Sequence, residues 1–266
     1  MITKNLITQT IFGAAMAFLF LSSCKKENSE EPQSPAVPLQ LTQFTDGDDV
    51  TSFEYNADGS LKTIKLKNDP VSTDDNVTYT VKYTANKKMD ELTGSNGVTL
   101  KLTYTNNLLS RMEAFDGTYK FAETTYEYNG SVMKSSLISL VDNNVSVPFF
   151  KGEFTFNAAG NMIRSNSFVY NPLTDKLESA GYVINQFDNK VNPFSSVSEV
   201  ITIFWQVTTK NNITMQQYFD KDGKAEEVVE TTYTYNAHGY PTRATIRETQ
   251  AGQQPVTSTV LYTYKQ

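Results

Sequence analysis

One short phrase recurs along this chain: two aromatic residues separated by one residue, then a turn that opens with asparagine and ends with glycine. It appears as FEYNADG at 53–59, FTFNAAG at 154–160 and YTYNAHG at 233–239. Alternate residues of a β-strand project to one face, so each aromatic pair belongs to a single face. The asparagine and glycine predict a type I turn that ends in the left-handed region, which is the connection of a bulged hairpin. The phrase therefore predicts a β-hairpin that the chain repeats.

Further copies of the phrase are less regular. DKDG at 220–223 is a close variant, and YTAN at 83–86 and YTNN at 104–107 carry asparagine where glycine would stand. Asparagine tolerates the left-handed conformation better than other residues with a side chain. The aromatic anchors near positions 55, 83, 104, 128 and 156 are 21 to 28 residues apart, enough for two strands and two turns. Because one hairpin cannot bury its aromatic face alone, we expect an all-β fold, an antiparallel meander of repeated β-hairpins forming a curled sheet or partial barrel.

One segment departs from this pattern. In NPFSSVSEVITIFWQV at 192–207, apolar residues recur at a helical spacing, and Pro193 and the serines can start a helix. Its β-branched residues favour a strand instead. We predict at most one short helix, near 193–205, which plugs the open end or the concave side of the sheet and buries Trp205.

The chain begins with a segment typical of an export signal. Lys4 precedes an apolar run at 11–21, shorter than the roughly 20 apolar residues that a membrane span requires. LSSC at 21–24 resembles a bacterial lipobox, whose cysteine is acylated after the chain is cut before it. An ordinary signal peptide and an uncleaved anchor are the alternatives, but Cys24 is the only cysteine and stands where the lipobox requires it. We expect a lipoprotein signal peptide at 1–23, a disordered tether at 24–40 and a single β-repeat domain at 41–266.

Lipid on Cys24 would fix the protein to a membrane, because acyl chains contribute about 0.8 kcal/mol per buried methylene. We expect the outer membrane, with its periplasmic and surface faces both open. Cleavage removes Lys4 and no acidic residue, so the formal net charge of −6 becomes −7. This acidic balance argues against nucleic acid as a partner.

The repeats also carry a resemblance. YNADGSL, YNGSVM, FNAAGNM and YNAHGYPTR resemble the tyrosine/aspartate (YD) repeats of bacterial surface proteins, with asparagine mostly in the second position. The strings FDNKVNPF, TTKNNIT and YTYNAHGYPTR, within 187–243, resemble a family of uncharacterised Bacteroidetes lipoproteins built from such repeats. Members of that family have been labelled with a possible porphyrin ligand, which implies a site for an apolar small molecule. The resemblance implies no catalytic residues.

The residues themselves offer little for catalysis. The single histidine, His238, stands in a predicted turn and cannot complete a metal pair or a Ser-His-Asp triad. Acidic clusters at 46–49, 74–75 and 220–223 fall in turns, and turn formation accounts for them. A glycan hydrolase would need two carboxylates about 5–9 Å apart across a cleft. We expect no enzyme, no cofactor and no metal site, and keep a carboxylate-based hydrolase as a third hypothesis.

Aromatic residues supply the remaining candidates for a site. The chain holds 15 tyrosines, 16 phenylalanines and one tryptophan, and the paired ones should form the core of the sheet. The ligand-binding candidates are the aromatic residues of the irregular segment, Phe187, Phe194, Phe204 and Trp205. Two functions follow. The first is a lipid-anchored binding or interaction module of the cell envelope with a protein partner, and the alternative is a carrier for a flat apolar small molecule such as a porphyrin.

Overall fold

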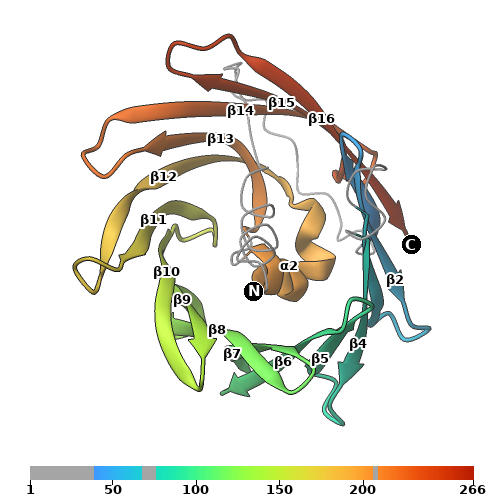
Figure 1. Ribbon diagram of the computed structural model, residues 1–266. Coiled ribbons are helices and arrows are strands. Elements are labelled where there is room, and N and C mark those ends of the chain that lie inside the picture. The colour runs from blue at the N-terminus through green and yellow to red at the C-terminus, as the bar shows by residue number, and fades with distance from the viewer. Residues whose placement is uncertain (1–38, 68–75, 206–208) are drawn as a thin grey trace.

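The chain folds into a barrel of antiparallel strands closed around one short helical segment (Figure 1). A computed structural model describes residues 39–67, 76–205 and 209–266, apart from the side chain of Trp205. The strands are β1 (Gln40–Asp46), β2 (Asp49–Tyr55), β3 (Leu61–Lys67), β4 (Val77–Tyr83), β5 (Met89–Gly94), β6 (Val98–Thr105), β7 (Leu108–Asp116), β8 (Tyr119–Asn129), β9 (Val132–Asp142), β10 (Val145–Phe156), β11 (Met162–Asn171), β12 (Lys176–Val191), β13 (Asn211–Phe219), β14 (Ala225–Tyr235), β15 (Pro241–Gln250) and β16 (Val256–Lys265).

Each strand pairs with its neighbours in sequence, and β1 pairs with β16, with Gln40 opposite Lys265. The predicted all-β hairpin meander is therefore confirmed. The sheet goes further than the partial barrel we expected, because its first and last strands meet and complete the ring. Closure leaves neither strand with a row of unpaired backbone groups.

The predicted turns are present. Gly59, Gly160, Gly223 and Gly239 all have positive φ, between 77° and 86°. Each glycine N–H donates to the carbonyl oxygen of the first turn residue over 3.0–3.1 Å. This geometry explains why the phrase ends in glycine, since a side chain at positive φ is strained.

The two asparagine variants differ from the prediction. In the turn after β4 the left-handed position belongs to Lys87, with φ of 60°, and not to Asn86. After β6, Asn106 and Asn107 both have positive φ, 51° and 65°. Two successive left-handed residues make the two-residue hairpin turn favoured by the twist of the strands, so this connection is shorter than the glycine turns.

The second aromatic residue of the phrase connects neighbouring hairpins. The hydroxyls of Tyr55, Tyr83, Tyr128 and Tyr264 each donate to a backbone carbonyl of the preceding hairpin or strand, over 2.6–2.9 Å. The acceptors are the carbonyl oxygens of Leu41, Leu61, Leu109 and Pro241, in that order. The repeat therefore carries its own link to the unit before it, in addition to the strand pairing.

The predicted helix near 193–205 is confirmed. It consists of a 3₁₀ turn, η2 (Pro193–Val197), followed by α2 (Ser198–Trp205), and lies inside the ring of strands (Figure 1). Asn192 caps it, since its side-chain oxygen accepts from the Phe194 N–H at 2.8 Å. Within the described residues, neither helical element is long and apolar enough to cross a bilayer.

The hydrophobic core is one-sided. The buried residues of its main cluster come from β1–β8, from β14–β16 and from the helical segment, and no described residue of that cluster comes from β9–β13. The helical segment Pro193–Trp205, the plug, therefore packs against one part of the barrel wall. The buried residues on the inner face of β9–β13, such as Asn185 and Gln216, are polar instead.

Candidate functional site

Two of the four predicted ligand-binding aromatics belong to the packed plug. Phe194 is buried, with its ring centroid 5.2 Å from that of Phe44 and 6.1 Å from that of Tyr262. Phe204 is half-buried, with its centroid 5.2 Å from that of Tyr79. Such edge and tilted contacts are those of aromatic rings inside a core. These two rings hold the plug against β1, β4 and β16.

The other predicted aromatics lie elsewhere. Phe187 belongs to β12 and is half-buried, with Ile213 of β13 opposite it. We expected it in an irregular segment, but the irregularity is a pair of register shifts within the strand. Trp205 ends α2, and its side chain lies outside the described residues, as does Cys24.

A carboxylate that the sequence analysis did not single out joins three strands next to the helical segment. Asp188 accepts from the backbone N–H groups of Lys190 at 2.9 Å and Asn212 at 3.1 Å. It also accepts from the side-chain amide of Asn212 at 2.9 Å and from the hydroxyl of Tyr235. Hydrogen bonds to a charged group are stronger than neutral ones. They join β12, β13 and β14 beside the helical segment, and the FDNK and KNNIT strings are their sequence signal.

Asparagines complete this attachment. The Asn192 side chain donates to Thr209 Oγ1 at 3.0 Å, which brings the start of the helical segment close to its end. Asn161 donates to Asn211 Oδ1 at 2.9 Å and accepts from the Asn211 N–H at 2.9 Å. The residues at which the chain leaves the wall and returns to it are therefore held together by polar groups.

Two more contacts join the plug to β1 and β6. Ser196 Oγ accepts from the Leu41 N–H at 3.0 Å, at the register irregularity of β1. Glu199, in the first turn of α2, accepts from the hydroxyl of Tyr104 on β6. Burial and then the bond to Glu199 raise the pKa of Tyr104, so this phenol stays protonated.

The inner wall opposite the plug is apolar and partly exposed. The cross-strand row Ala122, Leu140, Val147 starts at a buried core residue, yet Val147 is 40% exposed. In a second row, Phe150 is half-buried and its partner Val169 is 40% exposed. Because paired residues share a face, these side chains point into the barrel. Water therefore reaches apolar side chains on the inside of β10 and β11.

The next part of the inner wall carries acids. Three carboxylates face inward, because their strand partners belong to the core or pack against it. They are Asp46, Glu227 and Glu248, with partners Val260, Tyr218 and Val229 in that order. Burial and then the nearby Glu227 and Asp46 raise the pKa of Glu248. Burial and then Asp49 raise the pKa of Asp46. Glu227 and Asp46 are therefore close enough to Glu248 to disfavour its ionisation.

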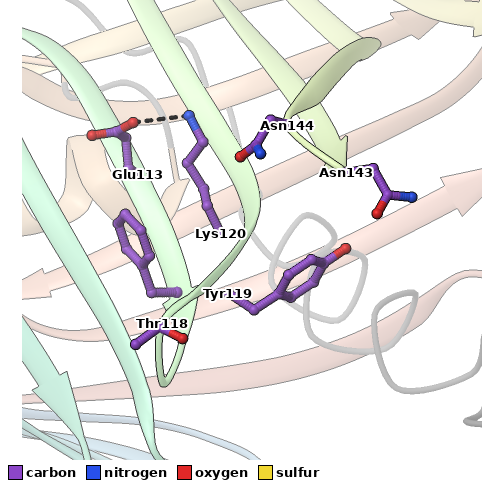
Figure 2. Close-up of a pocket in the computed structure, with 7 residues that line it drawn as sticks. Glu113, Thr118, Tyr119, Lys120, Asn143 and Asn144 are labelled. Atoms are coloured by element: carbon purple, nitrogen blue, oxygen red, sulfur yellow. Dashed lines mark hydrogen bonds and ion pairs between the residues drawn. The ribbon is translucent and has the colours of Figure 1, made fainter.

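A polar pocket lies on the barrel rim, between the β7–β8 and β9–β10 connections (Figure 2). Its volume is about 400 Å³, and its lining residues are mostly polar: Glu113, Phe115, Thr118, Tyr119, Lys120, Asn143 and Asn144. Lys120 Nζ lies 3.0 Å from Glu113 Oε1, as Figure 2 shows. An apolar carrier site would need an enclosed apolar lining, which this pocket does not provide.

The remaining polar candidates have structural roles. His238 is an exposed turn residue, as predicted, and its N–H donates to Asn236 Oδ1 at 3.0 Å. Asp220 Oδ1 accepts from the Asp222 and Lys224 N–H groups at 2.9 and 2.8 Å, which closes its turn. The acidic pair at 74–75 lies outside the described residues. No group of three or more metal-ligating side chains converges within the described part of the chain.

Comparison with solved structures agrees with this fold. The chain is similar to a porin-like protein from Bacteroides uniformis, with 15% identity and a TM-score of 0.60, over 87% of this chain and 99% of that one. It is also similar to a porin-like protein from Bacteroides vulgatus, with 15% identity and a TM-score of 0.56, over 85% and 99% of the two chains. Both organisms fall in the bacterial group that the repeat resemblance names, and at this identity the likeness shows the fold alone. No family model matches the chain, and no curated protein matches it.

Proposed function

We propose that this chain is a lipid-anchored envelope protein that binds a small apolar molecule inside a plugged barrel and catalyses no reaction. The observation that carries this proposal is the one-sided core. Val147, Phe150 and Val169 face the interior but remain partly exposed. Apolar side chains that water reaches on a concave inner wall favour an apolar ligand, because burying them is favourable at roughly 25 cal/mol per Å².

The polar side chains on the outer wall favour a barrel that is attached at the membrane surface over one that is inserted into the bilayer. Ion pairs face outward on both halves of the barrel: Lys120 with Glu123 at 3.0 Å, and Arg247 with Glu230 at 2.9 Å. Outward aromatic rings are also capped by cations, as Arg164 lies 3.7 Å from the ring centroid of Tyr182. A membrane-spanning barrel presents an apolar band to lipid. Lipid on Cys24 would therefore hold this polar barrel at the membrane surface.

The two structural neighbours are described as porin-like. A diffusion pore has a polar, water-filled interior and an apolar exterior. In this chain an apolar core cluster and a helix occupy part of the interior, and ion pairs face outward. A binding protein on the same fold accounts for these features better than a channel does.

Native mass spectrometry of the intact protein from its own cells tests this function. We expect a retained adduct in the parent and its loss in Phe150→Ala. Phe168→Ala is the matched control, because Phe168 is also half-buried on the neighbouring strand but lies on the outer face with Lys151 over its ring. Saturable uptake of N-phenyl-1-naphthylamine, a neutral apolar fluorophore, should follow the same order. Unadducted protein that also takes up no fluorophore would reject the proposal in favour of a protein-interaction role.

A further inference from the structure

We propose that the ligand is a small organic cation, with its apolar body against the inner wall of β10 and β11 and its protonated amine facing Asp46, Glu227 and Glu248. This inference rests on the proposed function and specifies the chemistry of the same site. It is carried by the distribution of charge and of hydrogen-bond acceptors on the inner wall.

The three carboxylates lie toward one end of the barrel. Asp46 ends β1, Glu227 lies near the start of β14, and Glu248 lies near the end of β15. Because adjacent strands are antiparallel, these positions are all at the same end of the barrel. Val147, near the start of β10, belongs to that end too. The apolar wall and the acids therefore line one opening, separated by β12 and β13 (Figure 1).

The acids lack inward counter-charges. Among the described inward-facing positions of β13–β16 and β1, the strand register places no lysine or arginine. Glu227 accepts one long bond, 3.4 Å, from the Gln250 side chain. On the outer face of the same two strands, Glu230 pairs with Arg247 at 2.9 Å. Glu230 is thus neutralised on the outer face, whereas the strand register offers the inward acids no cation. Because like charges held together are unfavourable, a cationic ligand would stabilise them.

A buried acceptor gives a second, independent indication. Asn185, Gln216, Val229 and Glu248 form one cross-strand row on the inner wall. Asn185 is 4% exposed, and its amide nitrogen donates to the Met162 carbonyl oxygen at 2.8 Å. Its side-chain oxygen has no donor among the described residues. A buried acceptor without a donor is unfavourable by about 1–3 kcal/mol, so this row favours a ligand that brings N–H groups.

The two indications agree on one chemical class. Carboxylates and an amide oxygen accept hydrogen bonds, and a protonated primary amine offers three donors with a positive charge. The exposed valines and Phe150 accommodate an apolar body. A ligand with acidic groups, such as a porphyrin that carries propionates, would be repelled at this end, so the possible porphyrin ligand that the repeat resemblance implies fits poorly.

Three probes with one ring system test the proposal: 1-naphthylmethylamine, 1-naphthalenemethanol and 1-naphthaleneacetate. Binding to the intact full-length protein is followed by naphthyl fluorescence anisotropy at pH 7. We expect the amine to bind at least 10-fold more tightly than the alcohol, and the acetate to bind most weakly. Equal affinity for amine and alcohol would overturn the cation assignment while leaving an apolar binding site in place. Failure of all three to bind would reject the proposed function as well.

Variants separate the acids from the apolar wall. The double variant Glu227→Gln, Glu248→Gln should weaken binding of the amine at least 10-fold and leave binding of the alcohol unchanged. Asp46→Asn should have the same selectivity if the double variant does not fold. Glu230→Gln is the matched control, since Glu230 lies one position from the Val229–Glu248 pair in register but faces outward. An equal loss of amine binding in Glu230→Gln, or no loss in any inward variant, would overturn the assignment.

Discussion

The hydroxyl of Tyr104 donates to the carboxylate of Glu199, which joins the barrel wall to the first turn of the plug helix. Equivalent tyrosines bind a neighbouring hairpin instead, as Tyr83 does through the Leu61 carbonyl oxygen at 2.9 Å. Tyr104 thus bonds to the plug helix, where equivalent tyrosines bond to a neighbouring hairpin. The side chain that would have joined two hairpins therefore holds the plug.

We expect Tyr104→Phe to lower the free energy of unfolding by about 1.5–3 kcal/mol, the usual range for a hydrogen bond to a charged group. Tyr83→Phe should cost about 0.5–1.5 kcal/mol, the range for a neutral pair. Urea denaturation of both variants measures the difference. In a double-mutant cycle, Glu199→Gln should couple to Tyr104→Phe and not to Tyr83→Phe. Additive effects at 104 and 199 would show that this bond does not hold the plug.

The turn geometry predicts opposite effects for replacing a glycine and for replacing a lysine at equivalent turn positions. Gly59→Val and Gly160→Val should each destabilise the fold by roughly 1–2 kcal/mol, because a β-branched residue is forced to positive φ. Lys87→Gly should stabilise it by about 0.5–1 kcal/mol, since Lys87 holds the same conformation at φ of 60°. Its exposed ion pair with Asp58 at 3.3 Å contributes little. Thermal melts that place Lys87→Gly below the parent would contradict the equivalence.

Glu123 should make the fold sensitive to acid. Burial opposes its ionisation, but hydrogen bonds from Arg111, Ser146 and Lys120 outweigh burial and lower its pKa to about 2. In the unfolded chain its pKa returns toward 4.5. Its contribution to stability is thus present above pH 4.5 and is lost as the pH falls toward 2. Melting temperatures of the parent and Glu123→Gln should differ most near neutral pH and converge near pH 2. A difference that is independent of pH would exclude this linkage.

Glu248 should behave in the opposite way. Its pKa in the folded chain is raised by burial, by Glu227 and by Asp46. A raised carboxyl pKa stabilises the fold below the unfolded pKa, and this contribution is lost as the pH rises through the folded value. Glu248→Gln should therefore raise the melting temperature at pH 7 and leave it unchanged near pH 4. Glu230→Gln, which breaks an outward ion pair, should not raise it at either pH. A lower melting temperature for Glu248→Gln at pH 7 would contradict the repulsion.

The lipid anchor is tested at Cys24. We expect Cys24→Ser to remain unacylated and to leave the membrane fraction of its own cells, since the described outer wall carries ion pairs such as Arg247 with Glu230. Metabolic labelling with an alkyne fatty acid and cell fractionation measure both effects. Retention of unlabelled Cys24→Ser in the membrane would point to another mode of attachment.

Local features were the ones that the sequence predicted well. The hairpin turns depend on a few adjacent residues, and the glycine that ends the phrase marks the position of positive φ. The helix at 193–205 depends on a local apolar spacing. The left-handed position of the turn after β4 was predicted at Asn86 and lies one residue later, at Lys87. Residue type favoured asparagine, whereas the length of the turn decides the position.

The site depends on relations that no local pattern carries. Glu227 and Glu248 lie on the two strands of one hairpin, whereas Asp46 lies in the first strand of the described chain. The three face one interior only because the barrel closes and sets their register. Phe187 was assigned to an irregular segment because register shifts in β12 break the alternation of the strand. The exposed inner wall of β10 and β11 follows from the position of the plug, which is a tertiary property.

The tyrosine links between successive hairpins have a consequence for how such a barrel can change size. Each link involves only one unit and its predecessor, so duplicating or deleting a hairpin leaves the other links intact, as in proteins built from stacked repeats. The number of strands in the barrel can then change by two while each hairpin keeps the same tyrosine link to its predecessor. The helical segment is the exception, because its contacts to β1, β4 and β6 span the interior and suit one diameter. The helical segment therefore fits the sixteen-strand barrel, and one hairpin more or fewer would change the distances between the strands that it contacts.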